Sequence, residues 1–136
     1  MGLTEIMEKG AIFANKDETI SDILRDFHDH KVGMQFDHEE ITIVIKDGVV
    51  SIEKGIRDDC HVVMKLSTEN MCSMIDGTKD RAEIREEGEI TKGDFSDPSL
   101  LVNFMAVSPY YDGLMRLYGE DTEFKMSVDD LKASLK

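Results

Sequence analysis

Three observations predict an α+β fold for this chain. Residues 41–46 and 49–53 are rich in β-branched side chains and are joined by Asp47-Gly48, a dipeptide that tolerates positive φ and favours a tight hairpin. Residues 61–66 (HVVMKL) form a further strand that leads directly into a helical segment. Apolar residues recur at helical spacing on both sides of this strand-rich region.

The first forty residues predict two helices and a short strand. Residues 4–14 favour a helix that Gly10 weakens, because glycine costs a helix more backbone entropy than other residues. Asn15 is suited to cap the next helix, with Glu18 at its third position. Gly33 ends this helix, and residues 32–37 predict the first strand. The apolar face of the helix consists of Ile20, Ile23, Leu24 and Phe27.

The central strands and the helix after them are the clearest elements. Ile41, Ile43 and Ile45 alternate with Thr42 and Val44, so the two sets face opposite sides of the sheet. After the strand 61–66, an N-cap at Ser67 or Thr68 and a stop at Gly77 define a short helix.

The C-terminal part predicts further helices around one edge strand. Residues 79–87 are mostly charged and indicate a solvated helix, and residues 89–92 indicate a brief edge strand. Asp97-Pro98 combines a capping side chain with proline at the first helical position. Pro109 is expected to stop or kink that helix, and Ser127 to cap a terminal helix. The segment 119–122 is the best candidate for a flexible joint.

Length and charge narrow the functional classes. The 136 residues predict a single domain, residues 1–136. Acidic residues outnumber basic ones 29 to 16, so the formal net charge is −13, which argues against nucleic acid and against stable docking on an anionic membrane. The apolar runs are far shorter than the roughly 20 residues that span a bilayer. With no recognisable signal peptide, the expected location is the cytoplasm.

Candidate catalytic and metal-binding residues are few. Cys60 and Cys72 lack the spacing of a metal or redox motif, and both are interpreted as packed thiols. His28 and His30, two positions apart on a predicted helix end, would point to different faces and cannot share one ion. We therefore expect no enzyme, no cofactor and no metal; Cys72 or Ser108 beside a histidine is the only arrangement that would suit an acyl hydrolase.

Methionine is unusually frequent, with nine in the chain. Its side chain is flexible and polarizable, so it adapts to ligands of variable shape. Met71, Met74 and Met105 lie on predicted helices, where methionines at helical spacing more often pack a core than bind a ligand. Both interpretations stay open at the level of sequence.

The strand and helix order resembles the sterol carrier protein 2 (SCP2) family of lipid-binding domains. The resemblance rests on the hairpin ITIVIKDGVVSIEKG, the strand-to-helix run CHVVMKLSTENMCSMIDGTKD and the segment EEGEITKGD, and it covers residues 32–118. It implies a mostly antiparallel five-stranded sheet with helices packed over one face, enclosing an apolar tunnel. Here the helical region after the last strand is extended, and a tail at 119–136 follows it.

The resemblance implies non-catalytic binding or transfer of a fatty acid, an acyl-CoA or a sterol-like molecule between sheet and helices. Tyr110 or Tyr111 would bond a head group. The alternative is an interaction protein with a filled core that acts through its helical surface, and a homodimer is left open. The residues expected to contact the ligand are Met71, Met74, Ile75, Leu101, Phe104, Met105, Tyr110, Tyr111 and Leu114.

Overall fold

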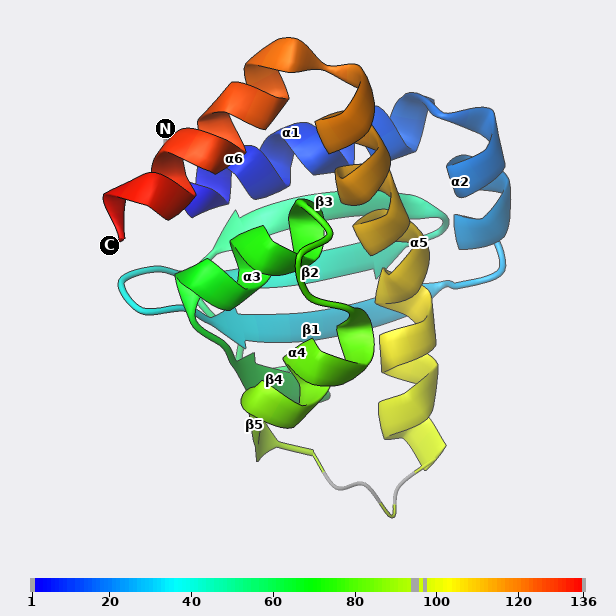
Figure 1. Cartoon of the computed structure of the whole chain (residues 1–136). Helices are drawn as coiled ribbons and strands as arrows, with labels where there is room; N and C mark the ends of the chain where they lie inside the picture. Colours follow the sequence, from blue (N-terminus) through cyan, green and yellow to red (C-terminus); the bar gives the residue numbers. More distant parts are fainter. Residues whose placement is uncertain (1, 94–95, 97, 136) are drawn as a thin grey trace.

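The computed structural model describes residues 2–93, 96 and 98–135, and it forms one five-stranded sheet with helices on one side (Figure 1). The strand order is β3-β2-β1-β4-β5; β1 and β4 are parallel and the other pairs are antiparallel. The elements are α1 (Leu3–Lys16), α2 (Glu18–Leu24), β1 (Asp29–Gln35), β2 (Glu40–Lys46), β3 (Val49–Lys54), β4 (Val62–Lys65), α3 (Thr68–Ile75), α4 (Arg81–Glu87), β5 (Glu89–Lys92), α5 (Pro98–Glu120) and α6 (Thr122–Ser134). This confirms the α+β fold and the mostly antiparallel sheet.

The β2–β3 hairpin turns at the predicted dipeptide. Asp47 and Gly48 have φ values of 52° and 82°, the left-handed conformation that a two-residue hairpin turn requires. The turn pairs Lys46 with Val49 and fixes the register of both strands. Gly48 carries this φ without steric cost because it has no Cβ.

The helix-facing side of the sheet forms the main core. Ile41, Ile43 and Ile45 of β2 are all fully buried there, together with Met34 of β1 and Met64 of β4. The predicted alternation along β2 is therefore confirmed. Burying an aliphatic side chain of this size contributes about 1.5–3 kcal/mol, so this face is a large part of the folding free energy.

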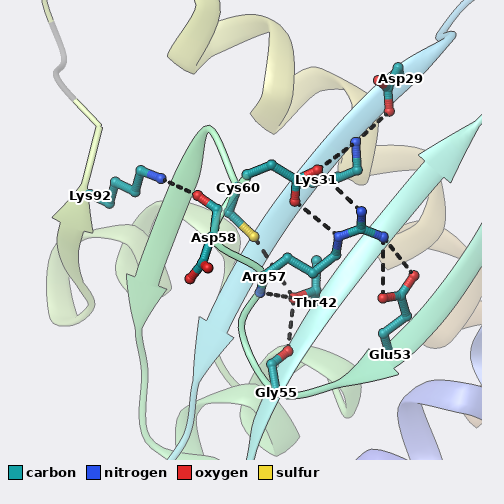
Figure 2. Close-up of polar contacts among 10 residues, drawn as sticks. Asp29, Lys31, Thr42, Glu53, Gly55, Arg57, Asp58, Cys60 and Lys92 are labelled. Atoms are coloured by element: carbon teal, nitrogen blue, oxygen red, sulfur yellow. Dashed lines mark hydrogen bonds and ion pairs between the residues drawn. The ribbon is translucent and has the colours of Figure 1, made fainter.

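The opposite face is covered by the connection from β3 to β4, which crosses β2 and β1 (Figure 2). The hydroxyl of Thr42 donates to the carbonyl of Gly55 at 2.8 Å and accepts from the backbone N–H of Arg57 at 3.0 Å. Cys60 packs beside it with its sulfur 3.8 Å from the Thr42 hydroxyl. Thr42 is thus buried with its hydrogen bonds satisfied, which avoids the cost of an unpaired polar group.

Charged side chains cover this crossing connection. Asp59 pairs with Arg57 at 2.9 Å and with Lys31 at 3.3 Å, and Arg57 also reaches Glu53. The hydrogen bond from Arg57 is the main reason that the pKa of Asp59 lies below its usual value. These groups border solvent, so we assign them to positioning the connection and not to a large gain in stability.

Several helix boundaries differ from the prediction. Asp17, not Asn15, caps α2, because the Asn15 amide pairs with both backbone groups of Val50 in β3. Asp121, not Ser127, caps α6, so Ser127 lies within that helix. The predicted cap Asp97 lies outside the described residues.

Further differences from the prediction concern the end of α2, the start of β1 and the middle of α5. α2 ends at Leu24, so His30 belongs to β1, where its Nδ1 lies 2.9 Å from Oδ1 of Asn103. The first strand is therefore longer than predicted and begins at Asp29. α5 continues through Pro109, which is buried inside the helix. In the described part of the chain, no helix is both long and apolar enough to cross a membrane.

A polar tie joins the end of α3 to α6. Lys132 donates to Oδ2 of Asp76 at 2.8 Å, and the Asp76 side chain is only 8% exposed. Burial alone would raise the pKa of Asp76, but hydrogen bonds from Lys132 and Thr78 outweigh it and lower the pKa. The ionised form is therefore the one that the fold stabilises.

We expect Asp76→Asn to lower the free energy of unfolding by about 1–3 kcal/mol at pH 7, because it removes a charged, largely buried hydrogen-bond acceptor. The folded pKa lies below the unfolded one, so this contribution is present above the unfolded pKa and is lost as the pH falls through the folded value. Urea denaturation at pH 7 and at pH 3 should show the difference from wild type shrinking in acid. Asp22→Asn, at an exposed ion pair, is the control and should change stability by less than about 0.5 kcal/mol.

Candidate functional site

An apolar cavity lies between the sheet and the helices α3, α4 and α5. Its volume is about 80 Å³. Its lining residues come from one side of the sheet and from α3, α4 and α5. Figure 1 shows these three helices on the same side of the sheet. The lining residues are Met34, Met64, Leu66, Met71, Met74, Arg81, Ile84, Arg85, Phe104, Val107, Ser108 and Tyr111.

Four methionines form the inner part of the cavity. Met34 and Met64 are register partners on the adjacent parallel strands β1 and β4, so both point to the helix-facing side. Met71 and Met74, three positions apart, share the buried face of α3, and Ser67, one of the two predicted caps, caps this helix. Because unbranched thioether side chains change conformation readily, this lining is more adaptable than one of branched aliphatic residues.

The short helix α4 covers the cavity and is held mainly by polar contacts. Among its described side chains only Ile84 is buried, and Asp80 caps its first turn. Arg81 donates to the Ser108 hydroxyl at 2.6 Å, pairs with Asp112 and lies 5.9 Å from the centre of the Tyr111 ring. These contacts tie α4 to α5 across the edge of the cavity.

A second arginine of α4 lies one turn further along. The guanidinium of Arg85 is 5.5 Å from the centre of the Phe104 ring, in a cation–π contact. Arg85 is exposed, whereas Phe104 is half-buried and contributes to the lining. The cavity is thus apolar inside and cationic at the edge beneath α4.

The two adjacent tyrosines have different surroundings. The Tyr110 hydroxyl donates to the carbonyl of Met7 at 2.6 Å and lies in the core, outside the cavity lining. Within the described part of the chain, the hydrogen-bond acceptor of the Tyr111 hydroxyl is the sulfur of Met34, at 3.8 Å, and sulfur is a weak acceptor. Desolvation raises the pKa of Tyr111 to about 12, so it is a neutral donor at neutral pH.

The structure brings four of the nine predicted ligand-contact residues to this cavity: Met71, Met74, Phe104 and Tyr111. Ile75, Tyr110 and Leu114 are buried in the core away from it. Leu101 and Met105 are 54% and 62% exposed, so they lie at the surface of α5 and not in the lining of this cavity. The helical periodicity of α5 identified an apolar helix but not which of its sides faces the sheet.

The remaining lining residues were not among the predicted ligand contacts; they include Met34, Met64, Arg81, Arg85 and Val107. The alternation of strand residues could have identified Met34 and Met64 as helix-facing. No local signal identified Arg81 and Arg85, because the segment 79–87 has the composition of a solvated helix.

The residues considered for hydrolysis lie in unsuitable surroundings. Cys72 is fully buried, and desolvation raises its pKa to about 11, so the thiol stays protonated at neutral pH. Ser108 receives its hydrogen bond from Arg81, a donor that cannot act as a base. Cys60 and Cys72 are both free and buried, as predicted. In the described ranges, no cluster of three metal-ligating side chains is present.

Comparison with known proteins supports the fold at low sequence identity. No family model and no curated protein sequence matches this chain. Among solved structures, it resembles a crystal structure of sterol carrier protein 2, with a TM-score of 0.62, 10% identity and coverage of 84% of this chain and 98% of the other. It also resembles a conserved hypothetical protein from Thermus thermophilus, with a TM-score of 0.59, 11% identity and coverage of 83% of this chain and 86% of the other. For the ubiquinone synthesis protein UbiJ-SCP2, the TM-score is 0.53 and the identity 13%, with coverage of 82% of this chain and 96% of the other.

The chain therefore has an SCP2-like fold, as the sequence predicted. At these identities the comparison concerns the backbone architecture, and the content of the cavity must be argued from this chain's own side chains.

The two tyrosines provide a test of the site geometry. We expect Tyr110→Phe to lower the free energy of unfolding by about 0.5–1.5 kcal/mol, since it removes a short buried hydrogen bond to Met7. Tyr111→Phe is the matched control and should cost less than about 0.5 kcal/mol, because the acceptor of its hydroxyl among the described residues is a sulfur atom. Equal costs in urea denaturation would contradict this assignment of the two hydroxyl groups.

Proposed function

We propose that this protein binds an apolar, lipid-like ligand without catalysis, in the cavity beneath α4. The proposal rests on an apolar cavity that has four methionines in its lining. The helix above it, α4, buries a single side chain, Ile84, among its described residues. Small-molecule sites are typically concave and apolar with a few polar groups at defined places. The SCP2-like fold supports the same class of function by analogy.

The cavity must enlarge to accept such a ligand. Its volume of about 80 Å³ is well below the range of about 300–1,000 Å³ found for sites of drug-sized ligands. Rearrangement of Met34, Met64, Met71 and Met74 would provide space without moving the backbone of the sheet. Displacement of α4 would provide more, because little apolar surface is lost when this helix moves.

We expect Val107→Phe to abolish uptake of a fluorescent fatty acid while the chain remains folded. The larger ring would occupy the cavity that Val107 lines. Val102→Phe is the matched control, since Val102 lies on the same helix but is 42% exposed. Fluorescence titration measures uptake and circular dichroism measures folding. Unchanged uptake by a folded Val107→Phe variant would show that the ligand binds elsewhere.

A second candidate function is self-association through α5. Leu101, Val102 and Met105 form an exposed apolar surface at helical spacing. Two copies of a chain with a net charge of −13 repel each other least where such uncharged surfaces meet. This is the specific form of the interaction-protein alternative that the structure favours.

We expect a wild-type dimer, if α5 mediates one, to dissociate when Met105→Glu places a carboxylate in this surface. Sedimentation equilibrium at increasing protein concentration measures the association. Ile12→Glu, at an exposed position of α1, is the control and should leave the association unchanged. A wild-type chain that stays monomeric at high concentration excludes this second candidate.

A further inference from the structure

Arg85 differs from the other four arginines in its partners. Arg25, Arg57, Arg81 and Arg116 each pair with at least one carboxylate. Among the residues that the structure describes, none forms an ion pair with Arg85, although acidic residues outnumber basic ones 29 to 16 in the chain. A guanidinium that has no such partner in the described part of so acidic a chain requires an explanation.

The position of Arg85 explains why it lacks a carboxylate partner in the described ranges. Its guanidinium lies over the ring of Phe104, at the edge of the apolar cavity, while the side chain remains exposed to water. Stacking on an aromatic face uses the plane of the guanidinium and leaves the N–H groups at its edge free to donate. Glu87, a nearby acid on the same helix, is paired with Lys79 at 2.7 Å.

Arg81 adds a second positive charge one turn away on the same side of α4. Residues four apart on a helix are neighbours, and both guanidinium groups lie at the lining of the same cavity. Arg81 shares its charge with Asp112 and donates to Ser108, so it is committed to holding α4 against α5. Arg85 is the arginine whose donors are available to a ligand.

We propose that the cavity takes single-chain amphiphiles with an anionic head group, and that Arg85 binds this head group. The inference rests on the proposed function and specifies its ligand class. The chain of the ligand would lie among the methionines, and a carboxylate, sulfate or phosphate would accept charge-assisted hydrogen bonds from Arg85. A local cation is needed because the net charge of −13 otherwise repels an anion.

The test compares dodecanoate with dodecanol, which share an alkyl chain and differ in charge. Dissociation constants are measured on the full chain by displacement of an uncharged fluorescent alkyl probe. We expect Arg85→Gln to raise the Kd of dodecanoate about tenfold, as loss of a charged hydrogen bond implies, and to leave that of dodecanol within about twofold. Arg85→Lys should retain part of the affinity for dodecanoate, and added salt should weaken it.

Arg25→Gln is the matched control, because it removes an exposed arginine on α2's C-terminal side without touching the cavity. If both ligands bind wild type and Arg85→Gln changes their Kd values equally or not at all, the head-group assignment is overturned and the binding function stands. If neither ligand binds wild type, the proposed function itself is overturned, and this inference with it.

Discussion

The close contact between α1 and α5 is the constraint on which the cavity depends. A Cβ at Gly10 would lie 2.2 Å from Cδ2 of Leu114, a side chain that is fully buried. The helices can pack at this distance because Gly10 has no side chain, and the hydrogen bond from Tyr110 to Met7 lies beside the same contact. α5 is thereby held against the core, and Phe104, Val107, Ser108 and Tyr111 are placed along one wall of the cavity.

The cover of the cavity is held by a different kind of interaction. α1, α3 and α5 bury apolar side chains against the sheet. α4 buries Ile84 and is otherwise held by hydrogen bonds of Arg81 and Lys79 and by the contact of Arg85 with the Phe104 ring. Polar contacts at a surface contribute little net stability, because water replaces them when they break. α3 and α5 are therefore held more firmly than α4, and we expect α4 to open locally before any other part of the site.

The sequence allowed the fold to be predicted better than the site. Turn chemistry at Asp47-Gly48, alternation along β2 and the cap at Ser67 are local, and the structure confirms each of them. The prediction that Asn15 caps α2 was wrong because its amide pairs with Val50, 35 positions away, and no local rule detects such a partner. Leu101, Phe104 and Met105 are all apolar on one helix, and only the packing of α5 shows that Phe104 alone among them faces the cavity.

The role of Arg85 shows why a charged segment cannot be interpreted from composition alone. Residues 79–87 have the pattern of a solvated helix, and most of them behave as one. The two arginines of this segment nevertheless lie over the rings of Tyr111 and Phe104 in α5, far from them in the chain. One is neutralised by Asp112 and the other has no carboxylate partner in the described part of the chain. The difference in pairing, more than the charge, is what distinguishes a positioning residue from a candidate ligand-binding residue here.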